Sequence, residues 1–437
     1  MRWTPLSVPW PVPLIATILN PADFIKHEAA KCVACGLCLP HCPTYRILHD
    51  EAESPRGRLS LMLAMAQGDL ALSAQMETHL AHCLACRTCE RVCPSYVPYG
   101  QILDAGRALI EQSHAANVPA RSRSVAGIMR LIEKPERINA LGKLLRLYQR
   151  TGLQRVLRAA RVPAWFGLGD LEANLPALPP QEPFARSYPV PEISRGRVMI
   201  FTGCLARITD RQTLNATIRL LNRLGYEVQV PEQGCCGALH LHNGQSGIAT
   251  GMMHQTIQAF TGATDTILST ASGCTATLCE YGKYLPGDRA AAEFSGRVMD
   301  INQFLASLPW PSGMSFRPLA RRIAVHSPCT LSNVLRQDDK PFSLLQRIPG
   351  AEVISLPDNS VCCGAAGTYH LTEPRIAREL RAPKIAHLKQ LAPDILVTSN
   401  PGCAMFLAAG MREAGLSMEV MHPVVLLEKQ LQDNQSD

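Results

Sequence analysis

Two cysteine runs with the same spacing stand near the start of this 437-residue chain. Each run has three cysteines separated by two residues, then a fourth after three more residues, followed by proline. The first run is Cys32, Cys35, Cys38 and Cys42, and the second is Cys83, Cys86, Cys89 and Cys93. This is the ligand spacing of a bacterial 4Fe–4S cluster, and two such runs are typical of a two-cluster ferredoxin. The chemistry that they predict is the transfer of single electrons.

The fourth cysteine of each run is expected to serve the other cluster. Three close cysteines can bind three irons of one cube, and in two-cluster ferredoxins the cysteine before proline binds the partner cluster. The spacing therefore predicts one cluster on Cys32, Cys35, Cys38 and Cys93, and the other on Cys83, Cys86, Cys89 and Cys42. A zinc site needs two pairs of ligands and has no use for a third evenly spaced thiolate.

Composition indicates a globular protein with metal-bound thiols in a reducing cytoplasm. The chain has 17 cysteines and 46% hydrophobic residues, and without a secretory signal disulfides are not expected. Met1–Thr17 is apolar but is broken by prolines, so we read it as an extended arm rather than a signal peptide. No stretch is apolar enough to span a bilayer, so membrane attachment is expected to be peripheral or through a partner.

A basic segment follows the cysteine runs. Between Arg121 and Arg161 stand eleven Lys or Arg residues and two acids, in a chain of net charge +7. Its apolar residues repeat at helical spacing: Leu141, Leu144, Leu145, Tyr148, Leu153, Val156, Leu157 and Ala160. The pattern favours a helix that packs on the next domain and keeps a solvated basic face. The alternative is a surface for anionic lipid or an acidic partner, whereas nucleic acid is disfavoured because no base-stacking aromatic platform is present.

The second half of the chain is an internal duplication. Each copy has a first cysteine, a Cys-Cys-Gly and a third cysteine site at nearly equal spacing. The first copy contributes Cys204, Cys235, Cys236 and Cys274, and the second contributes Cys329, Cys362, Cys363 and Cys403. The predicted strands before these sites are Val198–Phe201, Tyr226–Val230, Thr266–Ser269, Ile323–Val325, Glu352–Leu356 and Ile395–Thr398. Strands alternating with helices predict a parallel sheet, at whose carboxyl edge the cysteines of one copy should converge.

Two interpretations of these crevices stay open. The cysteines are candidate ligands of further clusters, or they are buried thiols of structural α/β domains. Adjacent cysteines such as Cys235 and Cys236 suit a cluster other than a simple cube, and nearby helix N-termini favour the thiolate. Cys279 has no counterpart in the second copy and is expected in the core. Nearby histidines, to which no catalytic role is assigned, are His240, His242, His326 and His370.

The expected fold class is α+β. A helical two-cluster ferredoxin-like domain (22–115) precedes a basic helical and proline-rich linker (116–192). Two tandem α/β Cys-Cys-Gly domains with parallel sheets follow (195–312 and 320–432).

Taken together, the motifs resemble the iron–sulfur subunit of glycolate oxidase. The resemblance runs from about residue 22 to the C-terminus, and related proteins are lactate-utilisation iron–sulfur proteins, the small subunit of anaerobic glycerol-3-phosphate dehydrogenase and the cysteine-rich subunits of heterodisulfide reductases. Some relatives have Cys-x-x-Cys at the third site of each copy, where Cys274 and Cys403 stand alone here. The residues that carry the resemblance are the cysteine runs, Cys42-Pro43-Thr44-Tyr45, Ser54-Pro55-Arg56-Gly57-Arg58 and the two Cys-Cys-Gly repeats.

The resemblance implies an electron-transfer subunit of an oxidoreductase, with no catalytic residue of its own and the eight N-terminal cysteines as ligands of two 4Fe–4S clusters. An FAD-containing 2-hydroxyacid dehydrogenase subunit would oxidise glycolate to glyoxylate, or D-lactate. This chain would pass the electrons to the respiratory chain, with quinone as the expected acceptor, at the cytoplasmic face of the inner membrane. A flavin on another chain agrees with the lack of a Gly-x-Gly-x-x-Gly after a strand.

Two other functions remain open. The chain could be a lactate-utilisation or heterodisulfide-reductase-like subunit, with thiol/disulfide chemistry at a Cys-Cys-Gly cluster. It could also be a scaffold whose clusters only hold the fold.

Overall fold

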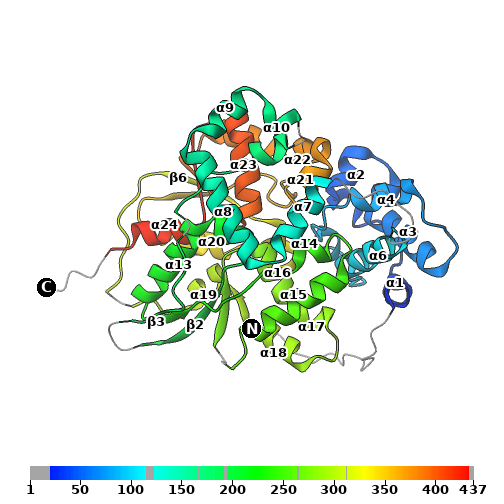
Figure 1. The fold of residues 1–437 in the computed structure, drawn as a ribbon, viewed down its shortest axis with the longest axis horizontal. Helices are drawn as coiled ribbons and strands as arrows, with labels where there is room; N and C mark the ends of the chain where they lie inside the picture. Colours follow the sequence, from blue (N-terminus) through cyan, green and yellow to red (C-terminus); the bar gives the residue numbers. More distant parts are fainter. Residues whose placement is uncertain are drawn as a thin grey trace, which may run out of the picture.

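The computed structural model describes residues 20–114, 123–165, 168–180, 182–190, 194–262, 265–311 and 313–432. The arm predicted at Met1–Thr17 lies outside these ranges. A helical N-terminal part, blue in Figure 1, lies beside two α/β units, coloured green to red. The predicted fold class is confirmed, because a helical part precedes two sheets that are parallel except at one edge.

The N-terminal helices pack around one hydrophobic core that includes Met62, Ile102 and Leu103. Helix α3 begins at proline, with the Ser54 side chain accepting a hydrogen bond from the backbone of the first turn, as expected of an N-cap. The elements of this part are α1 (Pro21–Ala29), α2 (Pro43–Leu48), α3 (Pro55–Gln67), α4 (Ala74–Ala81), α5 (Thr88–Arg91) and α6 (Tyr99–His114).

The linker is helical, as its periodicity predicts. Its helices are α7 (Arg123–Ile132), α8 (Pro135–Arg150), α9 (Leu153–Ala159), α10 (Val162–Trp165) and α11 (Gly169–Ala173). Helix α8 buries Ile138 and Gly142, and Leu145 packs on the first α/β unit, but Leu144 and Leu147 are exposed. The predicted apolar stripe therefore meets the protein only in part, since Leu144, one of its residues, is exposed.

The two sheets repeat one topology. The first has the order β1-β3-β2-β4-β5 and the second β7-β6-β8-β9; every pairing is parallel except that of β1 with β3. The first sheet consists of β1 (Ser187–Tyr188), β2 (Gly196–Phe201), β3 (Tyr226–Gln229), β4 (Thr266–Ser269) and β5 (Val298–Asp300). The second consists of β6 (Arg322–His326), β7 (Glu352–Ser355), β8 (Ile395–Thr398) and β9 (Glu419–Met421). Strand β1 lies within the stretch predicted as linker and supplies backbone partners to edge strand β3.

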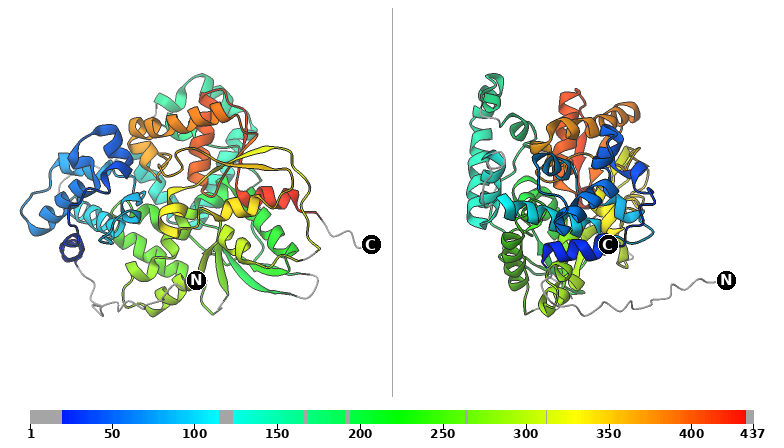
Figure 2. Two further views of the ribbon diagram at one scale, coloured as in Figure 1. Left: turned by 180° about the vertical axis from the view of Figure 1, so that it is seen from behind. Right: turned by 90° about the vertical axis from the view of Figure 1, so that its right-hand side faces the viewer.

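The two copies share a hydrophobic core. Ile200 of β2 and Val325 of β6 belong to one buried cluster, and the helices between the sheets pack across the duplication, α13 on α24 and α19 on α20. These helices are α13 (Arg211–Arg223), α19 (Ile301–Ser307), α20 (Lys340–Leu345) and α24 (Pro423–Gln430). The shared core fixes the two α/β units relative to each other, and the units lie side by side in Figures 1 and 2.

The remaining helices lie within or after the crossovers. In the first copy they are α12 (Leu205–Thr209), α14 (Ala238–Leu241), α15 (Ser246–Ala259), α16 (Ser272–Leu278), α17 (Tyr281–Tyr284) and α18 (Arg289–Arg297). In the second they are the π-helical turn η3 (Thr330–Leu335), α21 (Tyr369–Thr372), α22 (Pro374–Leu391) and α23 (Pro401–Glu413). Residues 39–41 and 51–53 form the short 3₁₀ turns η1 and η2.

Candidate cluster-binding site and cysteine crevices

The first cysteine run forms a loop after α1. Ala34 and Gly36 take positive φ angles of 52° and 79°, which turn the chain tightly between the cysteines. Burial, with smaller contributions from the nearby Cys32 and Cys35, raises the pKa of Cys38 to about 11. These three thiols are therefore close together, and Cys93, like Cys32, packs against the core of the N-terminal helices.

The second run meets the fourth cysteine of the first run. One cavity has a volume of about 320 Å³, which includes open solvent. Its lining includes the four thiols predicted to share a cluster: Cys42, Cys83, Cys86 and Cys89. Two of them, Cys42 and Cys86, are buried. The Tyr99 hydroxyl donates to Cys83 Sγ at 3.7 Å. A cavity walled by four sulfurs and polar donors suits an iron–sulfur cluster, whose potential depends on hydrogen bonds to sulfur.

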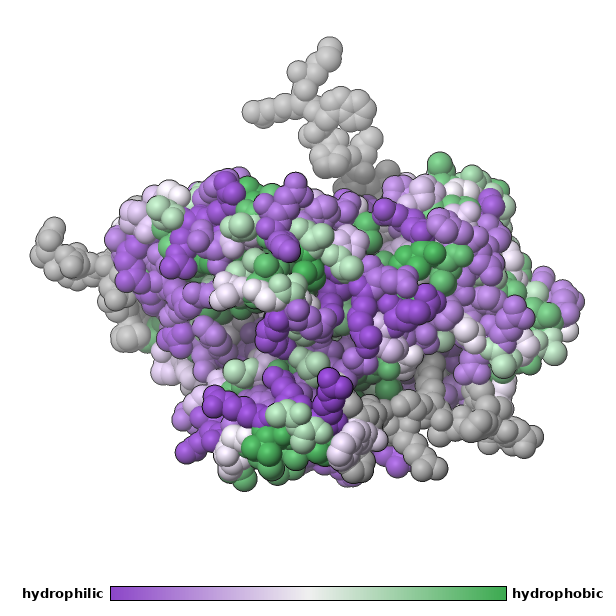
Figure 3. Space-filling view, turned by 90° about the horizontal axis from the view of Figure 1, so that it is seen from above, coloured by the Kyte–Doolittle hydropathy of each residue, from purple (hydrophilic) through white to green (hydrophobic). Residues whose placement is uncertain are grey.

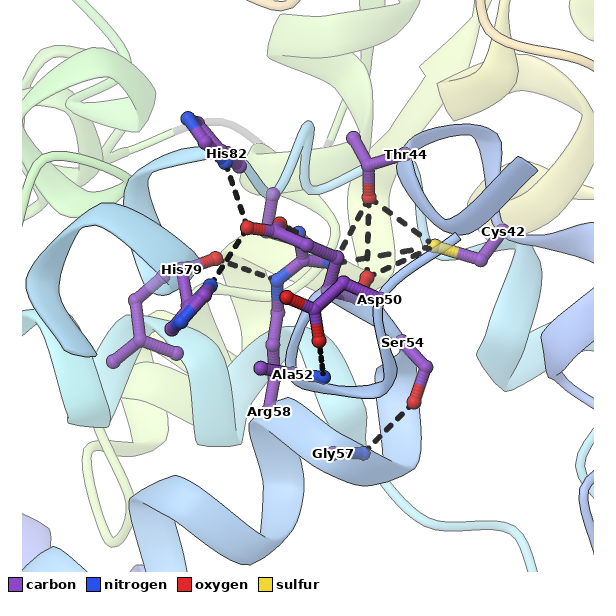
Figure 4. Close-up of polar contacts among 12 residues, drawn as sticks. Cys42, Thr44, Asp50, Ala52, Ser54, Gly57, Arg58, His79 and His82 are labelled. Atoms are coloured by element: carbon purple, nitrogen blue, oxygen red, sulfur yellow. Dashed lines mark hydrogen bonds and ion pairs between the residues drawn. The ribbon is translucent and has the colours of Figure 1, made fainter. Parts of the chain in front are cut away.

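A fully buried arginine lies against this cavity (Figure 4). Arg58 Nη1 donates to Thr44 Oγ1 at 3.0 Å and lies 3.9 Å from Cys42 Sγ, and its Nε donates to the His79 carbonyl at 2.6 Å. Its Nη2 pairs with the Glu53 carboxylate at 2.5 Å. Each nitrogen of the guanidinium thus has a partner, and its positive charge lies next to Cys42, a candidate cluster ligand.

Two histidines hold the other oxygen of the Glu53 carboxylate. The distances from His79 Nδ1 and His82 Nδ1 to Glu53 Oε1 are 2.7 and 2.8 Å. Burial opposes ionisation of Glu53, but the hydrogen bonds from His82 and His79 and the charge of Arg58 outweigh it, so its pKa lies below the ordinary value. The sequence reasoning assigned these side chains no role. The sequence features that could have pointed to them are the Ser-Pro-Arg-Gly-Arg motif and the two histidines just before Cys83.

The crevice of the first copy brings its four predicted cysteines together. Neighbouring thiols are in hydrogen-bonding contact in the order Cys204, Cys235, Cys236, Cys274. Its mouth is lined by Ile132, Pro135 and Ile138 of the linker, so α7 and α8 lie over it. Arg207 extends beside Cys204 and donates to Thr202 Oγ1 at 2.8 Å.

The crevice of the second copy also brings its four cysteines together. Cys329 and Cys362 are 3.9 Å apart at Sγ, and Cys363 and Cys403 are 3.3 Å apart. Hydrogen bonds from Cys362 and Cys403 lower the pKa of Cys363, and His326 adds to this against the effect of burial. The pKa of Cys403 is raised, first by its hydrogen bond with Cys363, although it lies in the first turn of α23.

The two crevices differ in their charged side chains. His326 ends β6 where Phe201 ends β2. Lys384 is buried in α22 near Cys363, and its Nζ donates to the Asp358 carbonyl at 2.6 Å. In the second copy Gly364 contacts the long following helix at Ala377, and in the first copy Gly237 contacts the equivalent helix at Ala249. Lys384 and Thr256 each lie seven residues after these contacts, so they are equivalent positions.

The other predicted histidines and Cys279 have structural partners. His240 pairs with Gln245 at 2.6 Å, and His242 with Asp104 at 3.0 Å. His370 Nδ1 lies 3.0 Å from the Ala365 carbonyl. Cys279 Sγ donates to the Val298 carbonyl at 3.8 Å and packs with the first crevice's core. Only His326 among the four makes a hydrogen bond to a thiol within the described residues.

The second cysteine run contacts both copies. Arg87 forms two hydrogen bonds with Glu280, at 2.6 and 3.0 Å, in the first copy. In the second copy, Asn333 Nδ2 donates to the Cys86 carbonyl at 2.8 Å. Burial raises the pKa of Cys86 to about 12, and Cys329 is the next cause. The four-cysteine cavity therefore adjoins the second crevice.

Single-ion metal sites and membrane spans are both absent from the described residues. No group of three or more His, Cys, Asp or Glu side chains in these ranges is arranged to hold a single metal ion. The thiolates of a cubane bind separate irons rather than one ion. None of the described helices has the length and apolar character of a membrane span.

Comparison with known families places each part of the chain. Residues 28–97 match "4Fe-4S dicluster domain", residues 126–175 match "Glycolate oxidase iron-sulfur subunit, linker region", and residues 198–279 and 323–408 match "Cysteine-rich domain". The chain is 34% identical to the "Probable glycolate oxidase iron-sulfur subunit" of Bacillus subtilis (strain 168), over 90% of this chain and 91% of that protein. It is 33% identical to the "Glycolate oxidase iron-sulfur subunit" of Escherichia coli (strain K12), over 92% and 94%. It is 26% identical to a fumarate reductase (CoM/CoB) subunit of Methanothermobacter marburgensis, over 95% of this chain and 75% of that protein.

Proposed function

Because the chain belongs to the family of glycolate oxidase iron–sulfur subunits, we propose that it carries electrons for a flavin-linked 2-hydroxyacid dehydrogenase complex. A partner FAD subunit oxidises glycolate to glyoxylate, and also D-lactate. This chain passes the electrons on to the respiratory chain, with quinone as acceptor. The observation that carries the proposal is the meeting of Cys42 with Cys83, Cys86 and Cys89 around one cavity.

The eight N-terminal cysteines are the proposed ligands of two 4Fe–4S clusters. Cys32, Cys35, Cys38 and Cys93 hold one, and Cys83, Cys86, Cys89 and Cys42 hold the other. Such clusters accept and release one electron at a time, whereas a flavin takes two from the hydroxy acid. The chain's own residues bind the clusters, exclude water around the buried Cys42 and Cys86, and direct Arg58 and Tyr99 toward sulfur.

A further iron–sulfur cluster in a Cys-Cys-Gly crevice is part of the proposal. The four-cysteine contacts in each crevice support it, with Cys204, Cys235, Cys236 and Cys274 as one ligand set and Cys329, Cys362, Cys363 and Cys403 as the other. The second crevice is the stronger candidate for exchange with the ferredoxin-like clusters, because Cys329 lies beside Cys86.

A second candidate function is thiol/disulfide chemistry at the second crevice, of the lactate-utilisation or heterodisulfide-reductase-like kind. The close approach of Cys363 to Cys403 and the lowered pKa of Cys363 favour it. The similarity to a CoM/CoB-linked protein agrees with this alternative. A thiol-exchange enzyme would consume a small disulfide when its clusters are reduced, and an electron carrier would not.

The test is anaerobic purification of the complex, followed by iron and sulfide counts and identification of the flavoprotein that accompanies the chain. We expect about eight irons per chain from two cubes, and more if a crevice is loaded. Addition of glycolate to the complex should reduce the clusters, while glycolate added to the isolated chain should not. A count of about four irons in an intact preparation, or reduction of the isolated chain by glycolate, contradicts the proposal.

The chain is further proposed to work in the cytoplasm, peripheral to the cytoplasmic face of the inner membrane. Support comes from the role itself, because a quinone acceptor lies in the bilayer.

A further inference from the structure

The linker helices carry an unusual concentration of exposed apolar side chains. Of the twelve large hydrophobic residues that are exposed in the described part of the chain, six fall between residues 144 and 168. They are Leu144, Leu147, Leu153, Val156, Trp165 and Leu168. Single exposed hydrophobic residues are normal on a protein surface, but six within one segment need a physical reason.

The exposed residues of α8 occupy the side away from the protein. Ile138 and Gly142 are buried, and Leu145 packs against the first α/β unit. Spacings of three and four residues place Lys143, Leu147 and Arg150 together on the opposite side of the helix. In the right-hand view of Figure 2 the linker helices, in cyan and teal, stand along one edge of the molecule.

The same face is basic. From residue 138 to residue 169 the sequence has six Lys or Arg and no Asp or Glu. Of the acids that flank this segment, Glu172 pairs with Arg158 and Asp170 with Arg378, and Glu136 lies in the first turn of α8. Among the described residues no acid forms an ion pair with Lys143, Arg150 or Arg155. Figure 3, seen from the side on which α9 and α10 lie in Figure 1, shows hydrophobic groups next to strongly hydrophilic ones.

We propose that the linker face, formed by Lys143, Leu144, Leu147, Arg150, Arg155 and Val156, docks the subunit on anionic lipid. A helix face that combines apolar side chains with an excess of Lys and Arg lies in the interface between headgroups and acyl chains. Leucine and valine enter the acyl boundary, and the basic side chains reach the lipid phosphates. Trp165, which is 77% exposed at the end of α10, is of the residue type enriched at that interface.

An acidic protein surface would also complement this charge, but lipid fits the observations better. The apolar residues are spread over the outer side of α8 and α9, which contact each other, instead of lining a groove for partner side chains. The inference rests on the proposed function, since a carrier that reduces quinone has to reach the bilayer. It does not depend on the substrate of the partner subunit.

The test uses the full chain, purified anaerobically, and vesicles of phosphatidylcholine with or without phosphatidylglycerol. The wild type should float with the phosphatidylglycerol vesicles, bind less at high salt, and stay behind with pure phosphatidylcholine. The double variant L147Q/R150Q should bind the anionic vesicles about tenfold more weakly. The matched control I248Q/R289Q changes one exposed apolar residue of α15 (44% exposed) and one exposed arginine of α18, both outside the linker, and should bind as the wild type does.

Equal binding by L147Q/R150Q, or no binding by the wild type, overturns the proposal. Release of a co-purified flavoprotein by this variant, with vesicle binding unchanged, also overturns it and identifies a protein partner instead. Iron content and dithionite reduction of the clusters are measured on the same samples. Because these readouts do not involve vesicles, failure of the lipid proposal is distinguishable from failure of the electron-carrier proposal.

Discussion

Replacing Arg58 should lower the reduction potential of the cluster that Cys42 serves. The guanidinium nitrogen lies 3.9 Å from Cys42 Sγ, and the side chain is fully buried. With an effective dielectric constant of about 20, a unit charge at that distance would stabilise an added electron on the sulfur by about 4 kcal/mol. The added electron is spread over the whole cluster and Glu53 opposes the effect, so about 1–2 kcal/mol remains, which is about 40–90 mV for one electron.

The variants R58Q, R58K and E53Q separate charge from structure. R58Q removes the positive charge and should lower the potential, whereas E53Q removes the opposing negative charge and should raise it. R58K keeps the charge, but one ammonium group cannot replace a guanidinium that contacts Glu53, Thr44 and the His79 carbonyl at once. R58K should therefore keep the potential near that of the wild type while lowering thermal stability.

The assay is an anaerobic redox titration followed by electron paramagnetic resonance, with iron counted in every sample. R46Q, which removes an exposed arginine from the nearby α2, is the matched control and should leave both potentials unchanged. The reasoning is refuted if R58Q retains its iron and both potentials stay as in the wild type. Shifts of R58Q and E53Q in the same direction would refute it as well, because opposite charges cannot act alike.

Three further results are expected. C42A should lose about four irons per chain, together with the spectrum of the cluster bound by the second run. Loss of the first run's cluster instead would contradict the proposal that the fourth cysteine of each run binds the other cluster. G57A should lower the melting temperature by the equivalent of about 2 kcal/mol or more, because its Cβ would lie 1.9 Å from the Glu51 carbonyl oxygen. The control is G127A, whose Cβ would have open space around it. Equal melting temperatures of the two variants would contradict this prediction. Burial raises the pKa of Asp300 to about 6, so its contribution to stability is present below about pH 4 and is lost as the pH rises through 6. The melting temperature of D300N relative to the wild type should therefore rise between about pH 4 and pH 6 and level off above about pH 7, by the equivalent of up to about 3 kcal/mol, and a difference that stays constant from about pH 4 to pH 7 would contradict the assignment.

Local patterns allowed much of this architecture to be predicted. Metal-ligand spacing and the alternation of short β-rich runs with helices are properties of neighbouring residues, so the cysteine runs and parallel sheets could be read directly from the chain. The structure also places Cys42 beside the second run, where the spacing predicts a shared cluster. These were the elements for which sequence periodicity and tertiary structure agree.

Long-range packing could not be predicted in the same way. Glu53 meets His79 and His82 across the fold of the N-terminal helices, and no spacing rule connects them. Leu144 was expected on the buried stripe, but it is exposed because the rotation of α8 is set by which side meets the first α/β unit. In each case a partner distant in sequence decides the environment.

The divergence of the two copies bears on how electrons travel. Duplication gives both crevices the same four thiols, so any functional difference has to come from the residues that changed around them. The second copy has His326 and Lys384 where the first has Phe201 and Thr256. A buried cation favours the addition of negative charge nearby. The second crevice also lies beside Cys86, whereas the mouth of the first is lined by linker helices. Each crevice thus has a cation near a thiol, Arg207 beside Cys204 and Lys384 near Cys363, and it is the proximity of Cys329 to Cys86 that supports the second crevice as the proposed site of redox exchange.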